Sequence, residues 1–193
     1  MADYRYDYWV KFHREHQFKR CAEIGVWDGA FGMNVLDTNP HIEEYHMVDP
    51  LSFEANHFAY TEEDRPQFME AGKYVCNMGV SGADRPENLD RLAANIEDQC
   101  TKRKNLFFHR LPSVEGAKKF EDGSLDFLYL DALHLYQPVK DDIAAWWPKL
   151  KPGGIFGGDD HNSAFPGVIR ACKEVFGERL INDWADQWYV TKD

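Results

Sequence analysis

Acidic side chains follow the ends of two apolar stretches in this chain. Asp131 follows the run 125–130, and Asp159 and Asp160 follow the short, glycine-rich run 155–158. Adjacent carboxylates at such positions cost free energy unless they are solvated or paired with a cation. Three carboxylates suit a hard divalent ion such as Mg²⁺, which prefers oxygen ligands and keeps water sites open. The alternative is that Asp131 or Asp160 caps a following helix.

Two histidines flank these acids. His134 lies three residues after Asp131, and His161 follows Asp160 directly. A neutral imidazole can act as a general base near neutral pH. Each histidine is therefore a candidate base or, alternatively, a hydrogen-bonded residue that supports the acids.

A glycine turn with a neighbouring acid is the second group of functional type. Glu23 stands two residues before Gly25, and Gly25-x-x-x-Gly29 joins a predicted strand, residues 21–26, to a predicted helix, residues 31–37. Glycine takes positive φ angles and lets a ligand approach the backbone closely. The pattern is typical of a strand that turns into a helix around a nucleoside.

Two further residues refine this interpretation. Trp27 stands where the dinucleotide fingerprint Gly-x-Gly-x-x-Gly has its middle glycine, and an indole there would obstruct a pyrophosphate. This speaks against an NAD-dependent oxidoreductase and leaves Trp27 as a pocket wall or a surface residue. Asp49 ends the predicted strand 45–49, where a carboxylate can accept hydrogen bonds from both ribose hydroxyls. The alternative for Asp49 is a surface turn before Pro50.

The elements that must position these residues alternate along the chain. Apolar runs predict strands at 21–26, 45–49, 105–109, 125–130 and 155–158, and a terminal hairpin of 180–183 and 187–191. Helices are predicted at 4–18, 31–37, 87–102, 139–147 and 165–176. This order predicts an α/β fold with a doubly wound, mostly parallel sheet, a C-terminal antiparallel hairpin and helices on both faces. Ligands bind outside the carboxyl ends of such strands, where the acids and the glycine turn lie.

Composition narrows the class of protein. The 193 residues are most simply one domain, 1–193, and the net charge of -11 argues against a nucleic-acid footprint. The four cysteines lie far apart, which fits neither a zinc site nor a disulfide framework and favours reduced thiols in the cytoplasm. With no apolar run of about 18 residues, we expect no transmembrane helix and no membrane partner.

These motifs resemble those of class I S-adenosylmethionine-dependent methyltransferases, which have a Rossmann-like fold. The resemblance covers about residues 20–162 and is most specific over 125–161, with Leu-Tyr-Leu-Asp-Ala-x-His-x-Tyr followed by Trp-x-Lys-Leu-Lys-Pro-Gly-Gly and an Asp-Asp pair. The chain is most similar to the small Mg-dependent sugar O-methyltransferases of the macrocin and aminocoumarin-sugar type, and more distantly to the catechol O-methyltransferases.

The resemblance implies two binding sites and a base. Residues implied to bind S-adenosylmethionine are Glu23, Gly25, Trp27, Gly29, Asp49, Ser113 and Asp131. Mg²⁺ or a similar divalent cation would be held by Asp131, Asp159 and Asp160. These relatives frequently have a second Asp that is a candidate base, but Leu133 occupies that position here. The catalytic residues implied are therefore Asp131 with His134 or His161, unless the metal alone lowers the pKa of the acceptor hydroxyl.

The function implied is O-methylation of a sugar, a glycan or another small polyhydroxyl acceptor, assisted by Mg²⁺. The alternatives are a metal-independent small-molecule methyltransferase and a non-catalytic module that binds the cofactor. Residues 51–82 form a lid or acceptor wall in one interpretation, with Phe53, Phe58, Tyr60 and Tyr74 against a sugar, or a packed insertion in another. The chain is expected to act as a homodimer or as one domain of a larger glycosyltransferase polypeptide.

Overall fold

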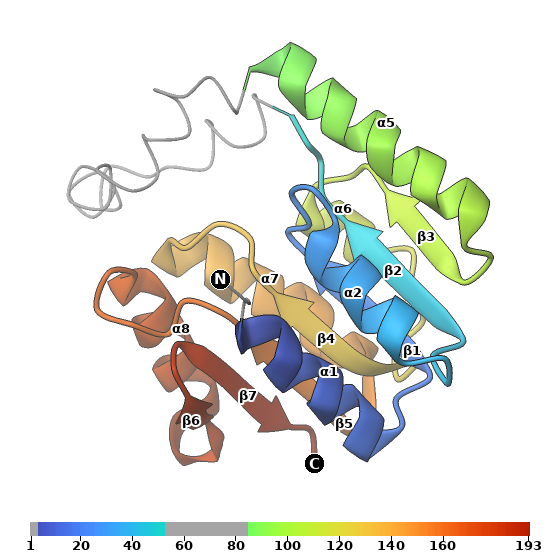
Figure 1. The fold of residues 1–193 in the computed structure, drawn as a ribbon. Coiled ribbons are helices and arrows are strands. Elements are labelled where there is room, and N and C mark those ends of the chain that lie inside the picture. The colour runs from blue at the N-terminus through green and yellow to red at the C-terminus, as the bar shows by residue number, and fades with distance from the viewer. Residues whose placement is uncertain (1–3, 53–84) are drawn as a thin grey trace.

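A seven-stranded sheet forms the centre of the molecule (Figure 1). The computed structural model describes residues 4–52 and 85–193. The strand order is β3-β2-β1-β4-β5-β7-β6, in which the first five strands are parallel and β7 is antiparallel to both β5 and β6. The predicted doubly wound sheet with an antiparallel C-terminal hairpin is confirmed. The proposed lid, residues 51–82 with its four aromatic residues, lies almost entirely outside the described residues.

The element bounds follow the predicted runs closely. The strands are β1 (Arg20–Ile24), β2 (Glu44–Val48), β3 (Leu106–His109), β4 (Leu125–Leu130), β5 (Leu150–Gly158), β6 (Ile181–Trp184) and β7 (Gln187–Thr191). The described helices are α1 (Tyr4–His16), α2 (Ala30–Thr38), α5 (Pro86–Lys102), α6 (Ser113–Ala117), α7 (Tyr136–Trp146) and α8 (Pro166–Phe176), with short 3₁₀ turns η1 (Trp147–Lys149) and η2 (Gly177–Arg179). None of these helices is both long and apolar enough to cross a membrane.

Helices cover both faces of the sheet. The alternation of a strand sends Phe127 and Tyr129 of β4 to the face that α1, α2 and α5 cover, and Leu128 and Leu130 to the face that α6, α7 and α8 cover. All four side chains are buried. Strands that are apolar on both faces are characteristic of such parallel sheets, which explains why the run 125–130 reads as almost wholly apolar.

Two elements differ from the expectation. Strand β5 begins at Leu150, although Lys151-Pro152-Gly153-Gly154 reads as a turn. The N–H of Gly153 donates to the carbonyl of Lys192, and the N–H of Lys192 donates to the carbonyl of Gly154, both at 2.8 Å, so contacts with the distant C-terminal segment keep this stretch extended. Helix α6 was not predicted, because its five residues are too short to show a helical period.

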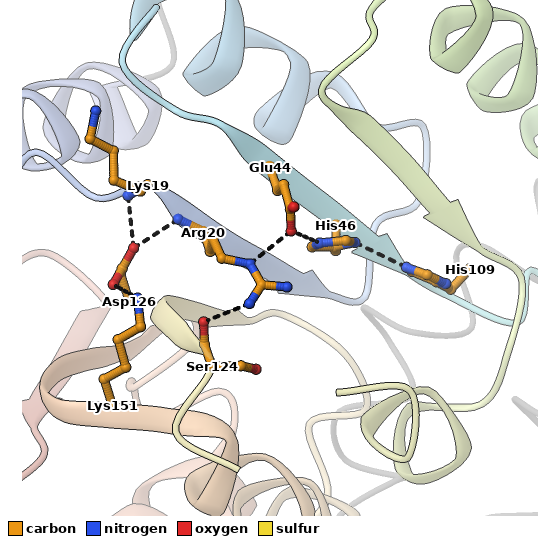
Figure 2. A network of polar contacts seen from close by, with 8 residues as sticks. All are labelled: Lys19, Arg20, Glu44, His46, His109, Ser124, Asp126 and Lys151. Carbon is orange, nitrogen blue, oxygen red and sulfur yellow. Dashed lines mark hydrogen bonds and ion pairs between the residues drawn. The ribbon is translucent and has the colours of Figure 1, made fainter. Parts of the chain in front are cut away.

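The amino ends of four parallel strands are joined by a polar network on Asp126 and Glu44 (Figure 2). Oδ2 of Asp126 accepts the backbone N–H groups of Lys19 and Arg20 at 2.9 and 2.8 Å, and its Oδ1 accepts Nζ of Lys151 at 2.7 Å. Nε of Arg20 donates to Oε2 of Glu44 at 2.7 Å. These contacts tie β1, β2, β4 and β5 together at the edge opposite to the strand ends where ligands are expected.

The same network continues to a pair of histidines (Figure 2). Nε2 of His46 lies 3.2 Å from Oε2 of Glu44, and Nδ1 of His46 lies 3.1 Å from Nε2 of His109. Burial lowers the pKa of both histidines. The pair therefore joins β2 to β3 through neutral rings.

Candidate cofactor and metal site

The register of the sheet brings the predicted site residues to one edge. Ile24 at the end of β1 pairs with Val48 of β2 and Leu130 of β4, and Leu130 pairs with Gly158 of β5. The next residues in each chain segment are Gly25, Asp49, Asp131 and Asp159. This edge includes the point where connections leave β1 and β4 in opposite directions, which is where ligands bind in open α/β sheets.

Gly25 allows the ends of β1 and β4 to approach each other. Its φ is 82°, and a Cβ at this position would overlap the Asp131 carbonyl and the backbone of Ala132. Its N–H donates to Val48 at 3.0 Å, while the N–H of Asp131 donates to Ile24 at 2.8 Å. A side chain at residue 25 would therefore push the glycine turn away from Asp131.

The rest of the turn leads directly into α2. Gly29, with a φ of 76°, immediately precedes the helix, and its N–H donates to the carbonyl of Val26 at 2.9 Å. Trp27 also has a positive φ, 53°, and is 38 % exposed. The indole of Trp27 is thus accessible at the turn, which fits a pocket wall and a surface residue equally.

Asp49 holds the glycine turn through its backbone. Oδ2 of Asp49 accepts the N–H groups of Val26 and Trp27 at 2.7 and 3.1 Å, and Oδ1 accepts the N–H of Leu51 at 2.8 Å. Burial raises the pKa of Asp49, although these hydrogen bonds act in the opposite direction. A carboxylate can accept about four hydrogen bonds, so capacity for a ribose hydroxyl remains.

Glu23 is buried below the turn. Its side chain lies beside α2, where a Cβ on Gly32 would overlap it, and the Tyr45 hydroxyl donates to its Oε2 at 3.2 Å. Burial raises the pKa of Glu23 well above the ordinary value, and the charge of Asp131 adds to this, against the opposing hydrogen bond from Tyr45. A protonated Glu23 can support the turn from the core side.

Ser113 is engaged beneath α7. Its Oγ accepts the Nε1–H of Trp146 at 2.9 Å, and its hydroxyl is hydrogen-bonded to Asp142. Asp142 is buried, which raises its pKa to about 7. The Ser113 side chain thus contacts two residues of α7, and its predicted place beside the cofactor stays a prediction.

Asp131, His134 and Asp160 form a compact group at the ends of β4 and β5. Each offers one donor atom, and the three atoms lie within 4.8 Å of one another. Nε2 of His134 is 3.2 Å from Oδ1 of Asp131 and 2.7 Å from Oδ2 of Asp160. Two carboxylates and an imidazole at this spacing fit a divalent cation.

The charge balance of this group rests on His134. Burial alone lowers the pKa of His134, but hydrogen bonds and charge from Asp131 and Asp160 outweigh it and raise the pKa to about 10. The contacts of His134 with the two carboxylates therefore favour its protonated form. His134 can accept a proton near neutral pH only where another cation balances those charges.

Asp159 does not belong to the group of donor atoms that lie within 4.8 Å of one another. It is 4 % exposed, and its Oδ1 accepts the N–H of Asp160 at 2.7 Å and the side-chain amide of Gln187. The structure therefore groups two of the three predicted metal-binding carboxylates with His134, and their role in binding a metal stays a prediction. Gln187 instead offers Asp159 a buried donor.

His161 also lies outside the group. Its Nδ1 contacts the Asn182 amide at 2.5 Å, with the Asn182 oxygen as the acceptor in the orientation that satisfies both groups. Its Nε2 is buried without a hydrogen-bond partner among the described residues. Burial lowers the pKa of His161, so it is neutral near pH 7, but its ring faces the C-terminal hairpin.

Comparison with known protein families decides the class of enzyme. The sequence profile of a family described as a methyltransferase domain matches residues 22–161, well over half of the chain. The chain belongs to this methyltransferase family. The match spans the glycine turn, Asp49 and the group of Asp131, His134 and Asp160. A search of curated proteins found no match.

Solved structures share the fold of this methyltransferase at low sequence identity. The S-adenosylhomocysteine-bound methyltransferase PaMTH1 of Podospora anserina aligns with a TM-score of 0.65 and 11 % identity, covering 100 % of this chain and 79 % of that one. The O-methyltransferase NovP gives 0.62 and 18 %, covering 97 % and 78 %. CalS11, a TDP-rhamnose 3'-O-methyltransferase of calicheamicin biosynthesis, gives 0.56 and 17 %, covering 95 % and 77 %.

Sequence reasoning missed two residues that support the site of this methyltransferase. Gln187 begins β7 and donates to Asp159, and Asp142 in α7 bonds to Ser113. Gln187 directly precedes the apolar residues of its strand, which can mark a buried polar group but does not name its partner. Asp142 follows the charged residues Lys140 and Asp141, so the sequence gives no sign that it is buried.

Proposed function

We propose that this protein transfers a methyl group from S-adenosylmethionine to a hydroxyl oxygen of a small polyhydroxyl acceptor such as a sugar. The observation that carries the proposal is the position of Asp131. Its backbone packs against Gly25 of the turn, and its carboxylate belongs to the group with His134 and Asp160. A cofactor bound at the glycine turn and an acceptor bound beside Asp160 would thus lie on opposite sides of Asp131.

Structural neighbours support the choice of cofactor and acceptor. PaMTH1 is described with bound S-adenosylhomocysteine, the product of methyl transfer from S-adenosylmethionine. NovP is described as an O-methyltransferase, and CalS11 as one that acts on TDP-rhamnose. We therefore take a hydroxyl of a sugar, free or carried on a nucleotide, as the acceptor class.

Asp131, Asp160 and His134 are the residues that would hold Mg²⁺ or a similar divalent cation. Carboxylate oxygens are the ligands Mg²⁺ prefers, whereas an imidazole also suits Mn²⁺ or Zn²⁺. When bound, such a cation supplies a Lewis acid that lowers the pKa of a coordinated hydroxyl. The protein residues themselves would orient the acceptor oxygen toward the methyl group of the cofactor. Such positioning lowers the activation barrier of methyl transfer.

Two histidines remain candidates for the proton acceptor. His134 is in the group, but its contacts with Asp131 and Asp160 raise its pKa to about 10 and so favour its protonated form. His161 is neutral near pH 7 but faces Asn182. Comparison of His134→Gln with His161→Gln separates them, because loss of the base lowers kcat by about 100-fold or more and removes the corresponding limb of the pH profile.

A metal-independent methyltransferase is the second candidate. The observation that favours it is the contact of His134 Nε2 with Asp131 at 3.2 Å and Asp160 at 2.7 Å, since a protonated His134 would balance part of their charge without a metal. In that case the acids would bind the acceptor hydroxyls directly. Dialysis against EDTA distinguishes the two, since the metal-assisted enzyme loses turnover and regains it with MgCl₂, whereas a metal-independent enzyme keeps full turnover.

The proposed reaction is tested by transfer of a radioactive methyl group from S-adenosylmethionine. The acceptors are TDP-rhamnose, free rhamnose and catechol, the last as a vicinal diol without a sugar ring. We expect transfer to a sugar acceptor with wild-type protein and at least about 100-fold less with Asp131→Asn. Cofactor binding by calorimetry with no transfer to any diol would contradict the proposal and indicate a non-catalytic module.

A further inference from the structure

Gln187 is a fully buried amide between the N-terminal helix and the candidate metal site. It is 1 % exposed at the start of β7. Its Oε1 accepts Nε1–H of Trp9 at 2.7 Å and the hydroxyl of Tyr129 at 3.0 Å. The indole N–H can only donate, so Oε1 must face Trp9 and the amide NH₂ must face Asp159.

The pairing of β5 with β7 puts this amide beside Asp159. Gly158 pairs with Trp188, so Asp159, which directly follows β5, stands opposite Gln187, the first residue of β7. Nε2 of Gln187 donates to Oδ1 of Asp159, and Nε1 of Trp188 donates to the Asp159 carbonyl at 3.0 Å. Strand β7 thus holds both the side chain and the backbone of Asp159.

Asp159 in turn fixes the backbone of Asp160. The N–H of Asp160 donates to the same Oδ1 of Asp159 at 2.7 Å. Asp160 has a φ of 62°, in the left-handed region that costs a non-glycine residue about 1 kcal/mol or more. This conformation directs Oδ2 of Asp160 to within 2.7 Å of His134.

We propose that Gln187 is a positioning residue that holds the Asp160 carboxylate in the candidate metal site by acting through Asp159. The inference rests on the proposed function. The side-chain hydrogen bonds of Gln187 go to Trp9, Tyr129 and Asp159. Its effect on the candidate metal site must therefore pass through the Asp159 carboxylate. Groups that orient metal ligands in this way typically change metal affinity about 10- to 100-fold when they are removed.

The test compares Gln187→Glu with Tyr129→Phe in the full chain. Gln187→Glu keeps an acceptor for Trp9 and Tyr129 but replaces the donor to Asp159 with a second acceptor. Tyr129→Phe removes a hydrogen bond to the same amide oxygen and leaves the donation to Asp159 intact. Gln187→Met, which has a similar shape and no donor, is the second variant in case Gln187→Glu fails to fold.

Calorimetric titration with MgCl₂ and, separately, with S-adenosylmethionine measures both affinities for each protein. We expect the Gln187 variants to bind Mg²⁺ at least about 10-fold more weakly, with S-adenosylmethionine affinity within about 3-fold of wild type. Tyr129→Phe should keep wild-type affinity for both, even where its melting temperature falls.

Three results would overturn the inference, and they are distinguishable. If wild type binds Mg²⁺ and the Gln187 variants bind it equally well, Gln187 has only a structural role and the proposed function stands. If wild type binds S-adenosylmethionine but no Mg²⁺, the metal assignment in the proposed function fails and the inference fails with it. An equal loss of Mg²⁺ affinity in Tyr129→Phe would also overturn the inference, since general loosening of the core would then explain it.

Discussion

At the scale of single residues, Asp49 has two roles to reconcile. It was predicted to bind ribose, and in the structure its carboxylate accepts backbone N–H groups from the glycine turn. These roles are compatible, because a carboxylate that fixes the turn also presents its remaining lone pairs at the sheet edge. The turn and Asp49 therefore act as one unit.

Substitution of Asp49 is expected to weaken cofactor binding first. Asp49→Asn retains one acceptor oxygen but presents an amide donor to N–H groups that need an acceptor. Loss of hydrogen bonds to a charged group costs about 1.5–3 kcal/mol each. We expect the Kd for S-adenosylmethionine, measured by calorimetry, to rise at least 10-fold while Mg²⁺ affinity stays near wild type. Weaker Mg²⁺ binding with unchanged cofactor affinity would reverse the assignment.

Asp142 gives a pH-dependent prediction. Its pKa is raised from 3.8 to about 7 by burial, so the folded protein favours the protonated carboxyl. The stability that this group contributes is present below pH 3.8 and is lost as the pH rises to about 7. The loss reaches at most about 4 kcal/mol above pH 7, because each pKa unit corresponds to about 1.4 kcal/mol.

Asp142→Asn should therefore stabilise the protein at pH 8. The amide is neutral at every pH and keeps an acceptor for Ser113. Thermal denaturation should show a melting temperature above wild type, by a difference that grows between pH 4 and 7 and then levels off. Asp141→Asn, an exposed neighbour with the same change of charge, should show no such trend. A constant difference across the pH range would refute the buried-carboxyl explanation.

At the scale of elements, aromatic rings explain the glycine pair that ends β5. A Cβ on Gly157 would overlap the Trp9 ring of α1, and a Cβ on Gly158 would overlap the Trp188 ring of β7. The rings occupy the space on the two faces of the strand that side chains would otherwise fill. Trp9 also donates a hydrogen bond to Gln187, and Trp188 donates one to the carbonyl of Asp159.

Gly157→Ala is expected to destabilise the protein by about 1–3 kcal/mol through this overlap. The double variant with Trp9→Leu should lose less stability than the sum of the single variants, because the smaller side chain makes room for the added methyl group. Urea denaturation of the four proteins measures the coupling. Strictly additive losses would show that Trp9 does not limit the space at Gly157.

The sequence predicts these elements well where local signals agree. The bounds of β4 are identical to the predicted run, since apolar residues are bounded by Gly123 and Asp131. It fails at Lys151 to Gly154, where proline and glycine suggest a turn but pairing with Lys192 extends the strand. The contact of Asp159 with an amide 28 residues later in the chain could not be predicted either. Local pattern cannot report such distant partners.

At the scale of the whole molecule, acid is expected to unfold the protein partly through His13. This residue is 0 % exposed, lies edge-on to Phe127 at a centroid distance of 4.3 Å, and donates from Nδ1 to the Trp9 carbonyl at 2.8 Å. Burial lowers its pKa from 6.5 to about 3, against the opposing effect of the bond to Trp9. Its stabilising contribution is present above pH 6.5 and is lost progressively toward pH 3.

At pH 5 the loss from His13 is about 2 kcal/mol, since each pH unit below 6.5 costs about 1.4 kcal/mol. His46 and His109 act in the same direction. His13→Phe should flatten the decline of melting temperature between pH 7 and 5, whereas His16→Gln, on the exposed side of the same helix, should leave it unchanged. An unaltered decline in His13→Phe would mean that other groups govern acid unfolding.

The contact between Trp9 and Gln187 joins residues 178 positions apart. A ribosome synthesises Trp9 long before Gln187, so the indole N–H of Trp9 lacks its Gln187 acceptor until residue 187 has been made. Contacts this distant in sequence also slow folding, because a long loop must close before they form. The Asp159–Asp160 segment therefore reaches its final conformation only after β7 is made, and the candidate acidic site of the nascent chain stays incomplete until Gln187 has been synthesised.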